Sequence, residues 1–284
     1  MINSDRKYAL RYVQVFRYLL LFIFISGAIG TITAQGDLLI YPKRLVFEGR
    51  NNIEKLMLSN TGKDTAVYNI SFLEYKMNET GDLKIISKAE AGVNSASSNV
   101  RFFPRKVILG PYESQKVKVQ IRNTRSLKDG EYRSHLYFRS EENEEALGKT
   151  STAKDSIMSA QLTAVFGISI PCILRKGINT TEVSISDLEF IQLPNQENIL
   201  KFNLKRTGNM SAYGDFTINY IAPNNKIYEV SKMQGVGVYT SGNLRIIQIK
   251  LHKPDTLRFK GGAFKVIFTK NESKEVLTEA QLML

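Results

Sequence analysis

Residues 162–172, LTAVFGISIPC, form an uncharged stretch in which large apolar side chains recur at every second position. This period of two predicts a β-strand. The strand follows a polar run, residues 140–156, and can therefore lie beside its predecessor or at the edge of a sheet. An apolar edge strand exposes backbone groups and side chains that recruit other chains, so this segment is a candidate binding strand. One parity is shared by Leu162, Ala164, Phe166, Ile168, Ile170 and Cys172.

Six further strand-like segments precede this stretch. Turn clusters separate them at spacings of about 8 to 12 residues, which is typical of an all-β sandwich. Together with residues 162–174 they make seven segments, the number of strands in an immunoglobulin-like sandwich. The six segments span residues 38–49, 53–60, 65–77, 99–109, 114–123 and 130–140.

A second series of seven alternating segments follows a break at Arg175-Lys176-Gly177. We therefore predict an all-β protein of two tandem immunoglobulin-like β-sandwich domains, residues 37–176 and residues 177–284. The linker is short, which favours a fixed angle and a cleft between the domains. The segments span residues 182–193, 198–208, 213–222, 226–239, 244–252, 261–270 and 275–284.

The first 34 residues have the pattern of a secretory signal peptide. A basic start precedes an apolar run of 12 residues, Tyr18 to Ile29, and small residues follow up to Ala34. The run is too short to span a bilayer by itself, so we predict export and cleavage after Ala34. A retained membrane anchor is the alternative. Export implies a periplasmic or cell-envelope location.

Cysteine usage and charge bound the function further. Cys172 is the only cysteine, which excludes an intramolecular disulfide, and it is either a small buried hydrophobe or a reactive thiol. The net charge is +12, and the first 34 residues contribute four basic and one acidic residue, which leaves +9 on the remainder. This excess favours solubility, an acidic surface or an acidic partner. No recognition motif accompanies it, so we predict no nucleic-acid binding.

Catalytic and metal-binding patterns are absent from the sequence. The two histidines, His135 and His252, occupy ordinary strand positions, and no G-x-S-x-G elbow occurs. The nearest Cys and His are 37 residues apart, without paired-ligand spacing. The glycines of QGVGVY, residues 234–239, are not followed by a helix and indicate a bulge or tight bend instead of a phosphate loop. We therefore predict no enzymatic activity, no metal site and no cofactor.

Four segments, in order behind a signal peptide, resemble the amino-terminal domain of the periplasmic pilus-assembly (PapD-like) chaperones. Two later segments, residues 206–220 and 261–268, are more weakly similar to the second domain of distant members. The resemblance implies two immunoglobulin-like domains in an L or boomerang arrangement, and identifies the chain as a divergent member. The four segments are IYPKRLVFEG (40–49), SNTGKDTAVYNISF (59–72), FFPRKVILGPYESQKVKVQI (102–121) and DGEYRSHLYF (129–138).

The same resemblance implies donor-strand complementation. In that family a pilus subunit lacks its last strand, and the chaperone fills the open groove with the last strand of its first domain. Backbone pairing gives affinity and alternating apolar side chains give register. By position the lent strand is residues 162–172, and in the alternative view its apolar side chains face their own core. The partner-binding side chains would be Leu162, Ala164, Phe166, Ile168 and Ile170.

The family also anchors the terminal carboxylate of the subunit with an arginine and a lysine. The arginine matches Arg44, whose guanidinium can grip a carboxylate through two parallel hydrogen bonds, although a surface role is the alternative. The lysine has no match in ISIPC, and Arg175 is a possible substitute anchor. The acidic start of the penultimate strand fits the family at Asp129 and Glu131, whereas SEEN replaces the proline at its end.

We therefore predict a non-enzymatic periplasmic chaperone whose partners are exported pilus or other β-rich surface subunits. An outer-membrane assembly platform is a possible second partner, although the altered penultimate strand departs from the pattern that supports it. The free edge strand could also mediate self-association. The alternative function is a structural or adhesive protein of the cell envelope, built from tandem immunoglobulin-like modules.

Overall fold

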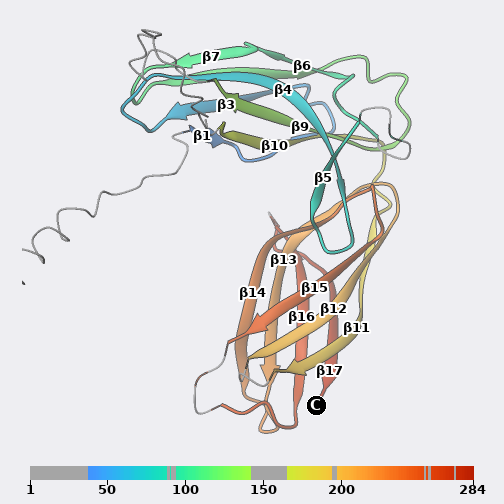
Figure 1. The fold of residues 1–284 in the computed structure, drawn as a ribbon. Helices are drawn as coiled ribbons and strands as arrows, with labels where there is room; N and C mark the ends of the chain where they lie inside the picture. The colour runs from blue at the N-terminus through green and yellow to red at the C-terminus, as the bar shows by residue number, and fades with distance from the viewer. Residues whose placement is uncertain are drawn as a thin grey trace, which may run out of the picture. The chain divides into compact units, whose positions relative to one another are not determined.

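The computed structural model describes residues 38–87, 90, 94–141, 165–193, 197–252, 254, 257–271 and 273–284. The predicted signal peptide, Leu162 and Ala164 lie outside the described residues. All regular elements in the described ranges are strands, and no helix there is long and apolar enough to cross a membrane. The region Leu38–Leu284 forms one compact unit (Figure 1).

The strands before residue 177 form two sheets that face each other. One sheet has the order β1-β3-β8-β6, and the other has the order β2-β10-β9-β4-β5 with β7 also paired to β4. The strands are β1 (Leu38–Tyr41), β2 (Leu45–Phe47), β3 (Ile53–Asn60), β4 (Ala66–Met77), β5 (Leu83–Ile86), β6 (Val100–Phe103), β7 (Lys106–Leu109), β8 (Ser114–Ile121), β9 (Gly130–Ser140) and β10 (Gly167–Lys176).

Two predicted segments pass from one sheet to the other at a proline. The segment 38–49 forms β1, which pairs with β3, and then β2, which pairs in parallel with β10. The segment 99–109 forms β6, which pairs with β8, and then β7, which pairs with β4. Pro42 and Pro104 lie at these breaks, and a proline has no amide hydrogen to donate to a ladder. The alternation along the sequence predicted each segment as one strand and did not indicate β5.

The strands after residue 177 form a second pair of sheets, ordered β11-β12-β15 and β14-β13-β16-β17. Each of the seven predicted segments contains one strand, so the expectation of two immunoglobulin-like sandwiches is confirmed. Division into separate domains at residue 177 and an L arrangement stay predictions. The strands are β11 (Glu182–Gln192), β12 (Asn198–Thr207), β13 (Ala212–Ile221), β14 (Ile227–Val238), β15 (Leu244–Leu251), β16 (Ala263–Lys270) and β17 (Val276–Met283).

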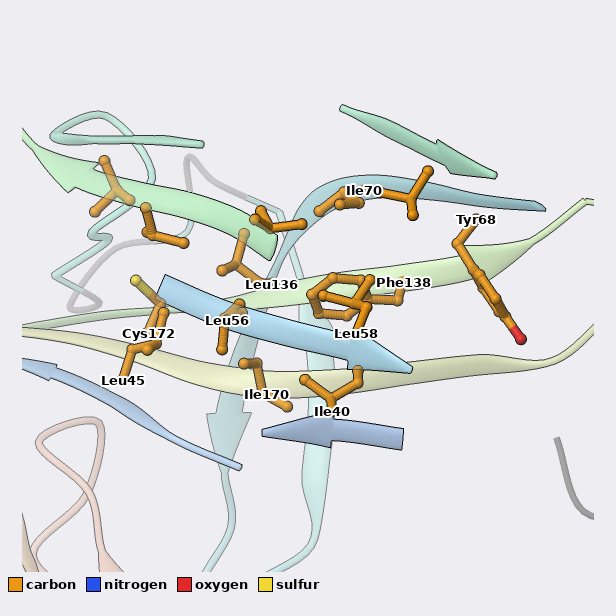
Figure 2. Close-up of a cluster of buried hydrophobic side chains, with 14 of the residues drawn as sticks. Ile40, Leu45, Leu56, Leu58, Tyr68, Ile70, Leu136, Phe138, Ile170 and Cys172 are labelled. Atoms are coloured by element: carbon orange, nitrogen blue, oxygen red, sulfur yellow. The ribbon is translucent and has the colours of Figure 1, made fainter. Parts of the chain in front are cut away.

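Each pair of sheets encloses its own apolar core. In the first sandwich the core contains alternate residues of facing strands, including Leu56 and Leu58 of β3 and Leu136 and Phe138 of β9 (Figure 2). In the second sandwich aromatic rings pack together, among them Phe202, Phe216 and Phe268. Period-two alternation along the strands therefore places one face of each sheet inside.

Candidate functional site

Strand β10 has an open edge at its amino-terminal half. It pairs with β9 over its whole length, from Gly167 to Lys176. On its other side β2 pairs only with Cys172–Leu174, so no described strand covers residues 167–171 on that side. The backbone of Phe166 bonds to Ser140 beyond β9, so in an antiparallel ladder the backbone groups of Gly167 and Ser169 point to the open side.

The alternate apolar side chains Phe166, Ile168 and Ile170 are exposed at the start of this segment and buried further along it. Phe166 and Ile168 are 50% and 37% exposed, whereas Ile170 is 4% exposed and packs with Cys172 in the first core (Figure 2). Phe166 and Ile168 are therefore exposed, and their role in binding a partner stays a prediction. Ile170 faces its own core, and we correct its assignment as a partner-facing residue. The described strand also begins at Gly167 and continues beyond Cys172 to Lys176.

The opposite face of the open segment is shaped by Tyr137 and Pro171. The side chain of Tyr137 lies over Gly167, where a methyl group would overlap the phenol ring. Pro171 ends the open segment next to the residues that β2 covers, and it has no amide hydrogen. An incoming strand would therefore find its outward backbone donors at Gly167 and Ser169.

The carboxyl-terminal half of β10 leads to a buried carboxylate. Glu131 on β9 is 0% exposed and accepts hydrogen bonds from Arg133 Nη2 at 2.8 Å and from Arg175 Nε at 3.1 Å. Ser211, in the second sandwich, donates from its backbone amide at 3.1 Å and from its hydroxyl at 2.6 Å. Burial alone would raise the pKa of Glu131, but Arg133, Ser211 and Arg175 outweigh it and lower the pKa to about 2.

Two arginines of the first sandwich stack on tyrosines of the second. The guanidinium carbon of Arg44 lies 4.0 Å from the ring centre of Tyr213, and that of Arg133 lies 3.7 Å from the ring centre of Tyr239. These distances suit cation–π contacts. We call Arg44, Glu131, Arg133, Arg175 and Ser211 the arginine cluster.

The arginine cluster carries an excess of positive charge. Three guanidinium groups surround one buried carboxylate, and the next acidic group, Glu48, is 58% exposed and 3.7 Å from Arg175 Nη1. Burial lowers the pKa of Arg44, and repulsion by Arg133 and Arg175 lowers it further. Nε of Arg44 is buried without a hydrogen-bond partner among the described residues. A second anion at Arg44 would relieve both the repulsion and the missing hydrogen bond.

The possible substitute anchor, Arg175, has other partners. Its Nε donates to Glu131, and its Nη2 donates to the backbone carbonyl of Ser211 at 3.2 Å. The structure brings Arg44 and Arg175 into one cluster, as shown by their electrostatic interaction. Arg44 retains free hydrogen-bonding capacity, whereas Arg175 is occupied in joining the two sandwiches.

The second sandwich supplies Ser211 to the arginine cluster and Tyr213 and Tyr239 to its stacking contacts, and the sequence pattern singled out none of these three residues. Gly235 and Gly237, in QGVGVY, leave room for the rings of Tyr213 and Tyr239, and the ladder is irregular opposite Gly235. The predicted bulge is therefore present, with a packing function. Arg206 holds the loop before Ser211 by donating to three of its carbonyls.

Cys172 and His135 of the first sandwich are both buried. Burial raises the pKa of the Cys172 thiol to about 12, with a smaller effect from Glu74. Burial, with repulsion by Arg133, lowers the pKa of His135 to about 3. Within the described ranges, no three His, Cys, Asp or Glu side chains gather closely enough to hold a metal ion.

Comparisons with known proteins found matches among solved structures. The YadV chaperone has a TM-score of 0.44 and 12% identity, and the match covers 87% of this chain and 100% of that one. The CsuC–CsuE chaperone–tip adhesion subunit complex of Acinetobacter baumannii has a TM-score of 0.40 and 14% identity, covering 74% and 89%. The CupB2 chaperone of Pseudomonas aeruginosa has a TM-score of 0.40 and 9% identity, covering 87% and 100%. No family model and no curated protein matches the chain.

Proposed function

We propose that this protein is an exported, periplasmic chaperone that binds and caps pilus-type or other β-rich subunits by lending them the open edge of β10. The observation that carries the proposal is the row Phe166–Ile168–Ile170, which leaves the core where no described strand pairs with the outer edge of β10. Natural sheets usually avoid an apolar edge of this kind because it recruits other chains. A binding strand requires that edge.

In the lent segment, residues 166–170, the backbone would give affinity and the alternating side chains would give register. Gly167 and Ser169 offer backbone groups to a partner strand, and Phe166 and Ile168 offer apolar side chains to its groove. Full burial of a large apolar side chain stabilises by about 1.5 to 3 kcal/mol, so removing the remaining exposed surface of Phe166 and Ile168 would contribute about 1 kcal/mol each. Leu162 and Ala164 continue the same alternation toward the amino terminus and belong to the proposal.

The arginine cluster is the proposed site for the terminal carboxylate of the subunit. Arg44 provides a guanidinium with unused hydrogen-bonding capacity, and Arg133 adds positive charge close by. Arg175, engaged with Glu131, holds the cluster in place. This activity is binding and needs neither a cofactor nor a reactive group.

Affinity capture from the periplasm of the host tests the proposal. We expect wild-type protein to recover exported β-rich subunits, and Phe166→Glu and Ile168→Glu to lose them while staying folded. Ile227→Glu is the matched control, since Ile227 is an exposed apolar strand residue in the second sandwich. Equal recovery by Phe166→Glu and Ile227→Glu would exclude strand donation. Ile170→Glu would unfold the first sandwich and is not informative about binding.

The anchor has its own test. A recovered subunit should bind less tightly when its carboxyl terminus is amidated, and Arg44→Ala should remove that difference. If amidation weakens the binding of the subunit to wild type and to Arg44→Ala equally, the carboxylate binds elsewhere.

Self-association has a separate test. If the free protein dimerises and Phe166→Glu abolishes the dimer, the same edge pairs with a second copy in the absence of a subunit.

A further inference from the structure

The outward face of the sheet β1-β3-β8-β6 is cationic and carries no acidic side chain. Outward positions are those that alternate with the buried residues of each strand. Four of them are Lys or Arg and none is Asp or Glu. They are Leu39 and Tyr41 on β1, Ile53, Lys55, Met57 and Ser59 on β3, Ser114, Lys116, Lys118 and Gln120 on β8, and Arg101 and Phe103 on β6. We call this set the basic face.

Two lysines of the basic face lie directly opposite each other. Lys55 of β3 is paired with Lys118 of β8 in the ladder. Like charges at opposed positions destabilise a sheet. None of Lys55, Lys116, Lys118 and Arg101 forms a salt bridge with another described residue. An external anion would offset this repulsion, because no described residue pairs an acidic group with these four cations.

Large apolar side chains are exposed among these cations. Tyr41 is 73% exposed and Phe103 is 77% exposed, and Phe103 is the ladder partner of Lys118. Leu39 and Ile53 are exposed on the same face. Tyr41 and the long basic side chains suit an interface between water and an apolar phase, because each has an apolar body and a polar or charged end. Phe103 has no polar end and supplies an apolar ring that can enter the apolar phase.

We propose that the basic face binds the surface of a membrane that contains anionic lipids. The combination of these cations with exposed Tyr41 and Phe103 favours a phospholipid surface over an acidic protein. An array of like charges attracts a negatively charged surface but does not hold a partner protein in one orientation. The face is on the sheet that does not contain β10, so the lent edge stays available. This inference goes beyond the proposed chaperone function, and its test contains no subunit.

Co-sedimentation with lipid vesicles tests the proposal. The protein is recovered after export, its amino terminus is checked by mass spectrometry, and it is mixed with vesicles of phosphatidylglycerol and phosphatidylcholine or of phosphatidylcholine alone. We expect binding to the anionic vesicles that falls with added salt. Each lysine near an anionic surface contributes about fivefold, so Lys55→Gln/Lys118→Gln should bind about 30-fold more weakly.

A matched double variant separates the basic face from net charge. Lys84→Gln/Lys260→Gln removes two exposed lysines elsewhere and should bind like wild type. Lys55→Gln/Lys118→Gln should unfold at the same temperature as wild type or a higher one, since it removes a repulsive pair. Equal losses in the two double variants would overturn the proposal. An absence of binding to anionic vesicles would also overturn it. If Lys55→Gln/Lys118→Gln then lost an acidic protein partner, the basic face would be a protein-binding surface instead.

Discussion

Replacement of Glu131 by glutamine removes the only buried anion of the arginine cluster and keeps its shape. The carboxylate accepts four hydrogen bonds, from Arg133, from Arg175 and twice from Ser211. In Glu131→Gln the side-chain nitrogen can accept none of them, and the three guanidinium groups lose their buried counter-charge while the exposed Glu48 remains beside Arg175. Stability should therefore fall, and the loss should depend on pH.

The pKa of Glu131 sets the size and the pH window of this loss. Its folded-state pKa of about 2 lies below the ordinary value of 4.5. A depressed carboxyl pKa stabilises the folded state fully above the unfolded value, and the stabilisation is lost as the pH falls from about 4.5 toward 2. A difference of this size corresponds to about 3 kcal/mol, which agrees with the cost of breaking a buried ion pair.

Urea unfolding of wild type and Glu131→Gln at several pH values measures this effect. At neutral pH we expect Glu131→Gln to be about 3 kcal/mol less stable, and we expect the gap to narrow steadily below about pH 4.5. Glu48→Gln is the control, because Glu48 also contacts Arg175 but is largely exposed. Its loss should stay below about 1 kcal/mol.

Two results would refute this reasoning. A gap between wild type and Glu131→Gln that is the same at neutral and acidic pH would mean that the charge of Glu131 is not what stabilises the cluster. Equal losses in Glu131→Gln and Glu48→Gln would mean that burial does not strengthen the interaction with Arg175. Either result would remove the physical basis for an excess positive charge at Arg44.

Three further predictions concern packing and buried groups. Gly208→Ala should cost about 2 kcal/mol or more in thermal unfolding, because Gly208 has a φ of +80° and a methyl group there would overlap the Thr180 carbonyl, whereas Gly242→Ala, with open space around it, should be nearly neutral. The Cys172 thiol should be inert to a thiol reagent in the native protein and react once on unfolding, and native reactivity would contradict its burial. The NMR signals of the His135 ring should not titrate between about pH 5 and 8, and a midpoint in that range would mean that the ring is hydrated.

The strand pattern was predictable because alternation is a local property. All seven segments of the second series contain a strand, since each is a clean alternating run between turns. The short strand β5, with the sequence LKII, was missed because none of its four residues is buried and its pattern is too brief to detect. Pro42 and Pro104 could be seen in the sequence as interruptions of their strands. The sequence does not show that the chain passes to the other sheet at these prolines, because that depends on pairing with strands distant in the chain.

The open edge of β10 was predictable only in part. Alternation shows that Phe166, Ile168 and Ile170 share a face. It does not show where the neighbouring strands end, and the ends of those strands decide which of the three side chains are exposed. The arginine cluster was harder to predict, because Glu131 and Ser211 are 80 residues apart and come from different sandwiches. One signal was available. Glu131 and Arg133 are two residues apart on β9, which places both charges on one face of the strand.

The open edge and the arginine cluster are linked by the ladder of β10. Leu45 is the ladder partner of Cys172, so Arg44 directly precedes the first paired residue of β2, as Pro171 directly precedes the first covered residue of β10. A subunit strand that ends with its carboxylate at Arg44 would therefore run parallel to β10, as β2 does. From Pro171 to Phe166 the path is five residues, or about 17 Å in an extended strand. Anchoring the last residue would thus fix which subunit side chains meet Ile168 and Phe166, since a slip of one residue turns every side chain to the other face. In the proposed complex, a fixed carboxylate would supply the register that an edge with only two outward backbone donors could not enforce by itself.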